Sequence, residues 1–345
     1  KPNSRSLIMS DSKLDQIIHD TEDSSQGNLL SFLQPKNWKI NLMAPREAKR
    51  KVEKSMQKAQ DTIAKARFIS RDLSWLKFDE RVLDQARDAE KSLFDRLKFL
   101  AITASNLDEF FTIRMGSLYN YIDFGKERTD YSGLREVPFK QTLVASAQEF
   151  SQEKHRLFIE EILPLFPENG LMLATLDDLS ADELADAESY FHRTIYPMLT
   201  PMVFDHTHTF PSLLGKTLIF GVVTKSEGER TETNINESRK ISFVQIPQNL
   251  KRFYVVERED EILFLPIEEI IRHEIWKLYK NVEIESVSLF RITRNGDFDV
   301  VEHEDSETDF IDEIKKKIKD RRLGRVTRIE MEAGCSDWML QMMLK

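Results

Sequence analysis

Between about residues 68 and 163 the apolar residues recur every three or four positions, which is the spacing of one face of an α-helix. The first expected helix has an apolar face formed by Trp75, Phe78, Val82 and Ala86. The pattern continues from Leu93 to Ile122, and a further helix is predicted from about Gln141 to Leu163. Pro164, Pro167, Asn169 and Gly170 then end that helix, so residues 67–168 are predicted to form an all-helical domain.

The stretch from Leu93 to Ile122 is either one long helix or two nearly collinear ones. The sequence favours a break at Ser105, because a Ser followed three residues later by Asp108 resembles a capping box, and Asp108-Glu109 suits the positive end of a new helix. Asn106 would then lie in the first turn with a free amide, whose donor and acceptor can read the edge of adenine. An Asn at a helix start is more often structural, so spacing alone does not assign this role.

After Gly170 the pattern changes to short apolar runs that are typical of strands. A helix is expected from about Ala181 to Tyr196, and strands are predicted at residues 217–223, 241–246, 253–256, 262–265, 287–292 and 325–331. Asn295-Gly296 is a hairpin signal, and helices are expected at about 266–280 and 306–320. Residues 169–345 are therefore predicted to form an α+β domain with a mixed or antiparallel sheet.

Composition limits the class of protein. With 345 residues, 40% of them hydrophobic, the chain is long enough for two domains with real cores. No apolar run approaches the roughly 18 residues that a membrane helix needs, and 32% of the residues are charged, so we expect a soluble protein without a membrane span. The single cysteine, Cys335, excludes a disulfide scaffold and a thiolate metal cluster, and it fits a cytoplasmic protein. Association with a membrane surface stays open.

Charge is distributed unevenly along the chain. The net charge is −9, yet residues 1–67 hold 13 Lys and Arg against 8 Asp and Glu. Residues 1–66 are therefore predicted to be a polar, basic and flexible N-terminal extension, in which residues 49–66 could form an exposed helix. An arm that binds nucleic acid or polyphosphate is the alternative, but no aromatic residues interleave the basic ones as single-strand binding would favour. A solvated extension is the preferred interpretation.

Most catalytic signatures are missing from the sequence: there is no glycine-rich phosphate loop, GxSxG or HExxH motif. His206 and His208 could share a metal ion if they lie on one strand, but a turn between Pro201 and Pro211 is the favoured interpretation. The basic run from Lys315 to Arg325 suits phosphate recognition, although a solvated helix face explains it equally simply. No metal ligand and no catalytic residue is assigned from these patterns.

Several motifs in order resemble one family. The stretch RDLSWLKFDERVL from Arg71 to Leu83 resembles the opening of the class 1 polyphosphate kinases, and RLKFLAI, SNLDEFF and Arg114 resemble the same family's next signature. The resemblance continues through Leu199-Thr200-Pro201 to Arg328 and covers roughly residues 68–335. Thr209 and Gly215 depart from the family pattern, and residues 1–66 have no clear counterpart.

The resemblance implies a helical N domain, a head domain and two further C-terminal domains. It implies reversible transfer of the terminal phosphate of ATP onto polyphosphate, through a phosphohistidine intermediate and with Mg2+. It also implies a homo-oligomer (dimer or tetramer), to which the head domain contributes contacts. Asn106 matches the family's ATP-binding asparagine. None of the seven histidines matches the nucleophile, so the catalytic histidine and the Mg2+-binding arginines are expected in a C-terminal half that this sequence lacks.

The ends of the chain also indicate a partial sequence. It opens on Lys1, and residues from Asp337 to Lys345 read as a helix cut off in mid-course. We therefore expect the N-terminal half of a polyphosphate kinase, which alone is inactive and which supplies an adenine contact and oligomer surfaces. A stand-alone, non-catalytic module that binds nucleotide or a kinase partner is the alternative, and a nucleic-acid binder ranks last.

Overall fold

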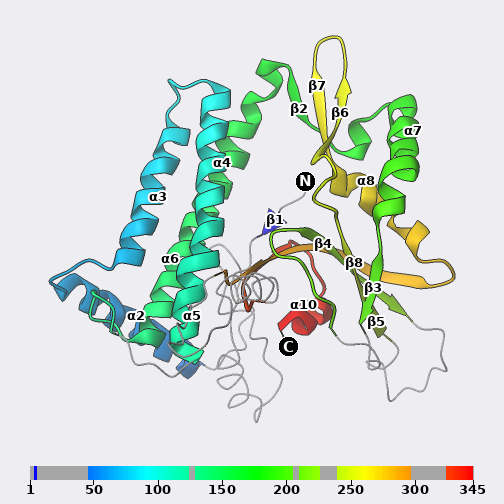
Figure 1. The fold of residues 1–345 in the computed structure, drawn as a ribbon. Coiled ribbons are helices and arrows are strands. Elements are labelled where there is room, and N and C mark those ends of the chain that lie inside the picture. Colours follow the sequence, from blue (N-terminus) through cyan, green and yellow to red (C-terminus); the bar gives the residue numbers. More distant parts are fainter. Residues whose placement is uncertain are drawn as a thin grey trace, which may run out of the picture. The chain divides into compact units, whose positions relative to one another are not determined.

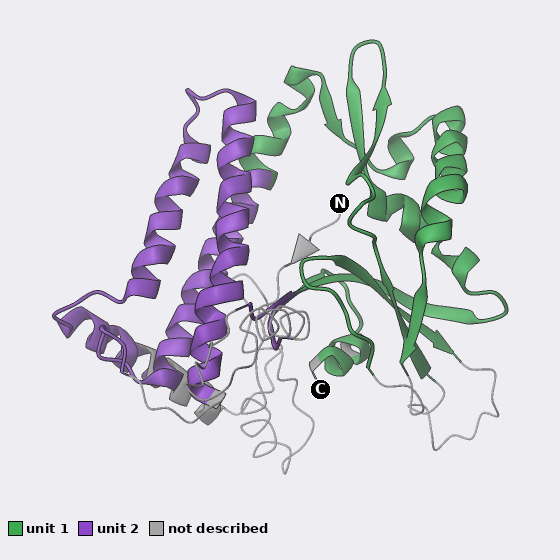
Figure 2. Ribbon diagram, in the orientation of Figure 1, with its two compact units in different colours: residues 1–5, 159–292, 330–345 green, residues 6–158, 293–329 purple. Residues whose placement is uncertain are grey.

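The computed structural model describes residues 4–5, 46–123, 129–204, 210–225, 239–296 and 324–344. The chain folds into two compact units, coloured separately in Figure 2. Unit 1 comprises residues 1–5, 159–292 and 330–345, and unit 2 comprises residues 6–158 and 293–329. Among the described residues, every helix is too short or too polar to cross a lipid bilayer.

Unit 2 is built mainly from helices (Figure 1). In chain order they are α2 (Arg46–Lys65), α3 (Arg71–Arg87), α4 (Leu93–Glu109), the π-helix η2 (Phe110–Met115), α5 (Gly116–Asp123) and α6 (Glu136–Leu157). The helices expected from the apolar spacing are thus confirmed. A π-helix (Phe158–Ile162) and two short 3-10 turns follow α6, and Gly170 ends them in the left-handed conformation at φ 64°.

Helix α3 buries a different face from the one predicted. Ser70 caps the helix by accepting a hydrogen bond from the backbone N–H of Leu73 at 3.3 Å. The buried stripe consists of Leu76, Asp79, Leu83 and Ala86, whereas Phe78 is 48% exposed. Apolar residues also flank this stripe, so the spacing alone allowed more than one inward face, and packing against α4 and α6 selects the stripe that contains a carboxylate.

The predicted helix break at Ser105 is wrong. Helix α4 runs without interruption to Glu109, and its true N-cap is Ser92, whose Oγ accepts from the backbone N–H of Asp95 at 3.2 Å. The irregularity falls later, at η2, where the Thr112 hydroxyl donates to the carbonyl of Asp108 at 2.6 Å. A π turn holds one more residue than an α turn, and here it keeps two adjacent phenylalanines, Phe110 and Phe111, inside the core.

Unit 1 contains most of the strand residues, while residues 293–294 and 326–329, which are also in strands, belong to unit 2. The α+β class with antiparallel and mixed sheets is confirmed. A six-stranded sheet has the order β1-β9-β8-β4-β5-β3, and a three-stranded sheet has the order β2-β7-β6. The bounds are β1 (Ser4–Arg5), β2 (Leu171–Leu173), β3 (Pro201–Phe204), β4 (Leu218–Lys225), β5 (Arg239–Gln245), β6 (Phe253–Glu257), β7 (Ile262–Pro266), β8 (Glu283–Arg294) and β9 (Val326–Glu332). In the larger sheet β4 pairs antiparallel with both β5 and β8; in the smaller, β2 and β7 are parallel.

Helices α7 (Ala181–Tyr190), α8 (Ile267–Glu274) and α10 (Asp337–Leu344) accompany the larger sheet. On β4, Phe220 and Val222 point into a buried cluster that includes Ile271 of α8. Gly221 points the other way, where a Cβ would lie 2.7 Å from the terminal methyl of Met339 on α10. Both faces of β4 are therefore covered, which explains why its sequence is continuously apolar rather than alternating.

Two expected features lie wholly or partly outside the described residues. The first is the helix expected at 306–320. The second is the hairpin at Asn295-Gly296, because the residues after Gly296 that would complete it are not described. Asn295 itself is buried within unit 2, where its Nδ2 donates to Asn120 Oδ1 at 2.9 Å and its backbone N–H donates to the carbonyl of Arg325 at 2.7 Å. The backbone N–H of Gly296 donates to the carbonyl of Thr112 at 2.8 Å.

Candidate functional site

A row of three side-chain pairs joins α3 to α4 and η2 within unit 2. We call it the α3–α4 row, and its pairs are Asp79 with Asn106, Trp75 with Phe110, and Asp72 with Arg114. Members from one helix are three or four residues apart, so they lie along one helix face. The row forms because a short connection makes α3 and α4 antiparallel neighbours. It gathers an amide, an indole ring and an ion pair from the motifs quoted above.

Asn106 lies in the last turn of α4, not in a first turn, and its side chain is partly exposed. Its Nδ2 donates to Asp79 Oδ1 at 2.8 Å. Burial raises the pKa of Asp79 to about 6, while the hydrogen bond from Asn106 and the positive charge of Lys154 act in the opposite direction. The sequence had predicted a free amide at Asn106, and this prediction is wrong: the amide donates a hydrogen bond to the buried carboxyl group of Asp79.

The next pairs of the row supply an aromatic surface and a cation. The Trp75 ring stacks on Phe110 with centroids 5.3 Å apart, and the Arg114 guanidinium lies 5.4 Å from the Trp75 centroid. Arg114 Nη1 also donates to Asp72 Oδ1 at 2.8 Å. Because Asp72 already balances the charge of Arg114, this end of the row offers a planar surface rather than a strong anion site.

Asp79 is the residue of this site that sequence reasoning missed. The available signal was a carboxylate spaced three residues after Leu76 and four before Leu83, which places it within a stripe of apolar residues. A charged residue in such a stripe is rarely fully buried without a partner. Asp79 was overlooked because the predicted inward face contained Trp75 and Phe78 and did not include position 79.

The other candidates from the sequence give no site here. His206 and His208 lie outside the described residues, and so does most of the basic run from Lys315 onward. Arg325, at the end of that run, is described; its guanidinium lies 5.1 Å from the centroid of the Tyr119 ring.

A carboxylate and imidazole cluster lies in unit 1. One ligand atom from each of Glu188, His273 and Glu274 lies within 4.8 Å of the others. Lys277 forms an ion pair with the buried Glu274, so a cation already occupies the position where a metal ion would compensate that carboxylate. We assign no metal to this cluster.

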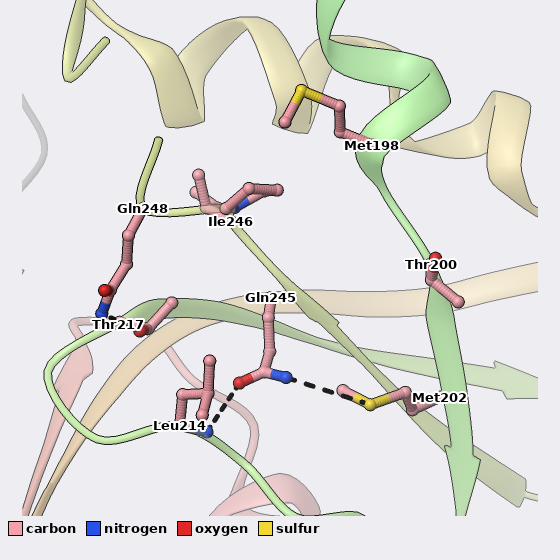
Figure 3. A pocket seen from close by; sticks show the side chains of 9 residues that line it. Met198, Thr200, Met202, Leu214, Thr217, Gln245, Ile246 and Gln248 are labelled. Atoms are coloured by element: carbon pink, nitrogen blue, oxygen red, sulfur yellow. Dashed lines mark hydrogen bonds between the residues drawn. The ribbon is translucent and has the colours of Figure 1, made fainter. Parts of the chain in front are cut away.

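Unit 1 also has a hollow of about 250 Å3 beside β3 and β5, shown in Figure 3. Gln245 and Gln248, two of its polar side chains, form hydrogen bonds with their neighbours. Gln245 Oε1 accepts from the backbone N–H of Leu214 at 2.7 Å, and Gln248 Nε2 donates to Thr217 Oγ1 at 2.9 Å. Among the described residues, no titratable side chain lines the hollow, so we assign no acid–base chemistry to it.

Comparison with known proteins identifies the family. The polyphosphate kinase N-terminal domain matches residues 68–174, and the polyphosphate kinase middle domain matches residues 182–345. The chain therefore belongs to the polyphosphate kinase family, as its motifs predicted.

Among similar proteins, the polyphosphate kinase of Halalkalibacterium halodurans is 37% identical over 287 residues, which cover 83% of this chain and 40% of that protein. The polyphosphate kinase of Lactiplantibacillus plantarum is 34% identical, over 78% of this chain and 36% of that protein. The crystal structure of polyphosphate kinase from Porphyromonas gingivalis superimposes with a TM-score of 0.51 at 25% identity, covering 64% of this chain and 33% of that one. The match thus spans about two fifths or less of these relatives' length.

Proposed function

We propose that this chain is part of a polyphosphate kinase that transfers the terminal phosphate of ATP reversibly to polyphosphate. In this proposal residues 67–168 supply a nucleotide contact, and residues 169–345 supply contacts of a homo-oligomer. The phosphohistidine and the groups that bind Mg2+ belong to a part of the complete kinase outside these 345 residues. This chain therefore binds and positions, and the chemical step belongs to the other part.

The observation that carries the proposal is the state of Asn106. An asparagine in a helix usually points its amide to solvent or competes with the backbone for hydrogen bonds. Asn106 instead has its donor fixed by Asp79 while the side chain stays partly exposed, beside the partly exposed ring of Trp75. A fixed amide next to an aromatic surface suits recognition of a nucleobase edge.

The test is Asn106→Ala in the complete kinase. Binding of the β,γ-methylene analogue of ATP, which cannot transfer its terminal phosphate, is measured by calorimetry. Loss of one hydrogen bond to the base is expected to weaken binding by about three- to tenfold. Ser105→Ala is the matched control, because Ser105 is the exposed neighbour on the same helix turn. Affinity that stays within twofold for both variants would contradict the proposed role of Asn106.

The oligomer contacts are supported by exposed apolar side chains in unit 1. Trp276, Phe210 and Leu214 are 60%, 47% and 44% exposed, and each is a large apolar side chain that a partner subunit would cover. Sedimentation velocity of the complete kinase tests this part. A dimer or tetramer that dissociates in Trp276→Glu would support it, and a strict monomer would refute it.

A further inference from the structure

The carboxyl group of Asp79 is fully buried, although a buried carboxylate is unfavourable unless both of its oxygens have hydrogen-bond or ion-pair partners. It is 0% exposed on the inner stripe of α3. Its Oδ1 accepts from Asn106 Nδ2, whereas its Oδ2 is buried and has no hydrogen-bond partner among the described residues. Burying a carboxylate with half of its acceptor capacity unused is unfavourable, so a folding role alone would be served better by an apolar residue.

The bond to Asp79 determines which end of the Asn106 amide is available. An ionised carboxylate only accepts hydrogen bonds, so the amide must turn its Nδ2 inward. Asn106 Oδ1 is left on the other side of the amide and makes no hydrogen bond among the described residues. The partly exposed side chain therefore turns its carbonyl oxygen, an acceptor, away from Asp79, and one of the two N–H donors of Nδ2 is held by the carboxylate.

We propose that Asp79 is a positioning residue that makes the nucleotide site selective for a 6-amino purine over a 6-oxo purine. The inference rests on the proposed nucleotide contact of Asn106. Adenine presents an N6 amino donor, which the Asn106 carbonyl oxygen accepts. Guanine and hypoxanthine present an O6 acceptor at that position, where two acceptors would face each other. An unpaired polar group at such a site is a strong basis for discrimination.

Asp79→Asn removes this constraint on the Asn106 amide with almost no change in the shape of the side chain. The amide of an asparagine at position 79 can accept from Asn106 Nδ2 or donate to Asn106 Oδ1, so the Asn106 amide is free to turn either end outward. The variant is therefore expected to bind a 6-oxo purine better and a 6-amino purine worse. A residue with only a structural role would weaken both ligands together.

The experiment compares the β,γ-methylene analogues of ATP and ITP in the complete kinase at pH 7.5. The two ligands share ribose and phosphates, so the ratio of their dissociation constants reports the base alone. In Asp79→Asn the preference for the ATP analogue is expected to fall by about tenfold. Asp84→Asn is the matched control, because it removes a carboxylate from the exposed side of the same helix, and its ratio is expected to equal that of the unmodified kinase.

A pH series on the unmodified kinase gives a second test that needs no folded variant. The pKa of Asp79 is about 6, and the charge that faces it is Lys154 on α6, while α4 contributes the neutral amide. Below that pKa the carboxyl group gains a proton and can donate to Asn106 Oδ1. The preference for the ATP analogue is therefore expected to decline between pH 7.5 and pH 5, and to stay flat in Asp79→Asn.

The outcomes separate this inference from the proposed function. If Asn106→Ala weakens the ATP analogue but the ratio is unchanged in Asp79→Asn and across pH, the positioning role is refuted while the nucleotide contact stands. If Asn106→Ala leaves ATP binding unchanged, both are refuted. A reduced ratio with a tighter ITP analogue in Asp79→Asn supports both.

Discussion

Arg328 on β9 and Asp108 on α4 form an ion pair inside unit 2, although 220 positions separate them in the sequence. The Arg328 side chain is 1% exposed, and its guanidinium lies 4.8 Å from the centroid of Phe111 in η2. Asp108 follows Asn106 by two residues, so the pair holds the turn that carries the proposed nucleotide contact. Asp108 thus has a role other than starting a helix.

Removing this guanidinium is expected to destabilise the protein. Arg328→Met should lower the free energy of unfolding by about 2–3 kcal/mol, because Asp108 would lose a buried partner while keeping some access to water. Chemical denaturation of Arg328→Met, Asp108→Asn and the double variant measures the coupling. The double variant should lose less than the two single variants together; additivity within about 0.5 kcal/mol would show that the pair contributes nothing specific.

Gly116→Ala is expected to destabilise the protein although Gly116 is helical. Replacing a helical glycine by alanine usually stabilises by about 0.5–1 kcal/mol. Here a Cβ would overlap the Asn295 amide, which is fixed by its bond to Asn120 and by the backbone bond to Arg325. Overpacking of this kind costs about 1–3 kcal/mol, so the net effect on the free energy of unfolding should be a loss.

Two further variants test that explanation. In an Asn295→Ala background the same Gly116→Ala change should become neutral or stabilising, since the overlapping atoms are gone. Gly221→Ala on strand β4 is a comparison, because there the Cβ would meet the terminal methyl and Sδ of Met339 at 2.7 and 3.1 Å, in a flexible side chain that can move, and Phe290 only at 3.4 Å. Equal losses at positions 116 and 221 would argue against the overlap with Asn295.

These contacts show what the sequence could predict. Local spacing predicted the type of these elements and their approximate positions: the strand expected at 217–223 is β4 (Leu218–Lys225), whereas the helix expected from Gln141 to Leu163 begins earlier, at Glu136, and its α-helical part ends at Leu157. The inward face of α3 and the π turn at Phe110 did not follow, since both depend on partners distant in sequence: Asn106 is 27 residues from Asp79.

The candidate site was predicted only in part. Asn106 came from its motif, and its surroundings were misjudged because Ser105 imitates a helix start. The same Ser-x-x-Asp pattern at Ser92 is the real cap, and local sequence does not distinguish the two. Tertiary packing distinguishes them: α4 continues through Ser105 into η2, where Phe110 and Phe111 are buried.

Arg258→Lys is expected to loosen the start of α7. Arg258 donates to Glu183 Oε1 at 2.9 Å and Oε2 at 2.7 Å, and to the carbonyl of Asp178 at 2.8 Å. A lysine ammonium cannot reproduce this fork. The thermal midpoint should fall, and amide hydrogen exchange should accelerate in the first turn of α7. Arg81→Lys is the control, because the contacts of Arg81 with described residues stay within its own helix, to the carbonyl of Lys77 and the ring of Phe78, and it should change neither quantity.

The same ion pair has a defined pH dependence. The hydrogen bonds from Arg258 lower the pKa of Glu183 from 4.5 to about 2. A carboxyl group whose pKa is lowered on folding stabilises the fold at pH values above its ordinary pKa of 4.5. This contribution is lost as the pH falls toward 2. Exchange in α7 should therefore differ between Arg258→Lys and the unmodified protein at pH 7 and converge toward pH 2. A constant difference would assign the effect to packing instead.

Asp79→Asn is expected to stabilise the protein while reducing its selectivity. The pKa of Asp79 is raised from 3.8 to about 6, so its contribution to stability is greatest below pH 3.8 and is lost as the pH rises through 6. At pH 7.5 the neutral amide should increase the free energy of unfolding by about 1–3 kcal/mol, and this gain should shrink toward pH 4. Denaturation at pH 7.5 and pH 5, with Asp84→Asn as control, measures both. A loss of stability at pH 7.5 would mean that the bond from Asn106 outweighs the burial of the charge, and that Asp79 is kept for the fold rather than for the orientation of Asn106.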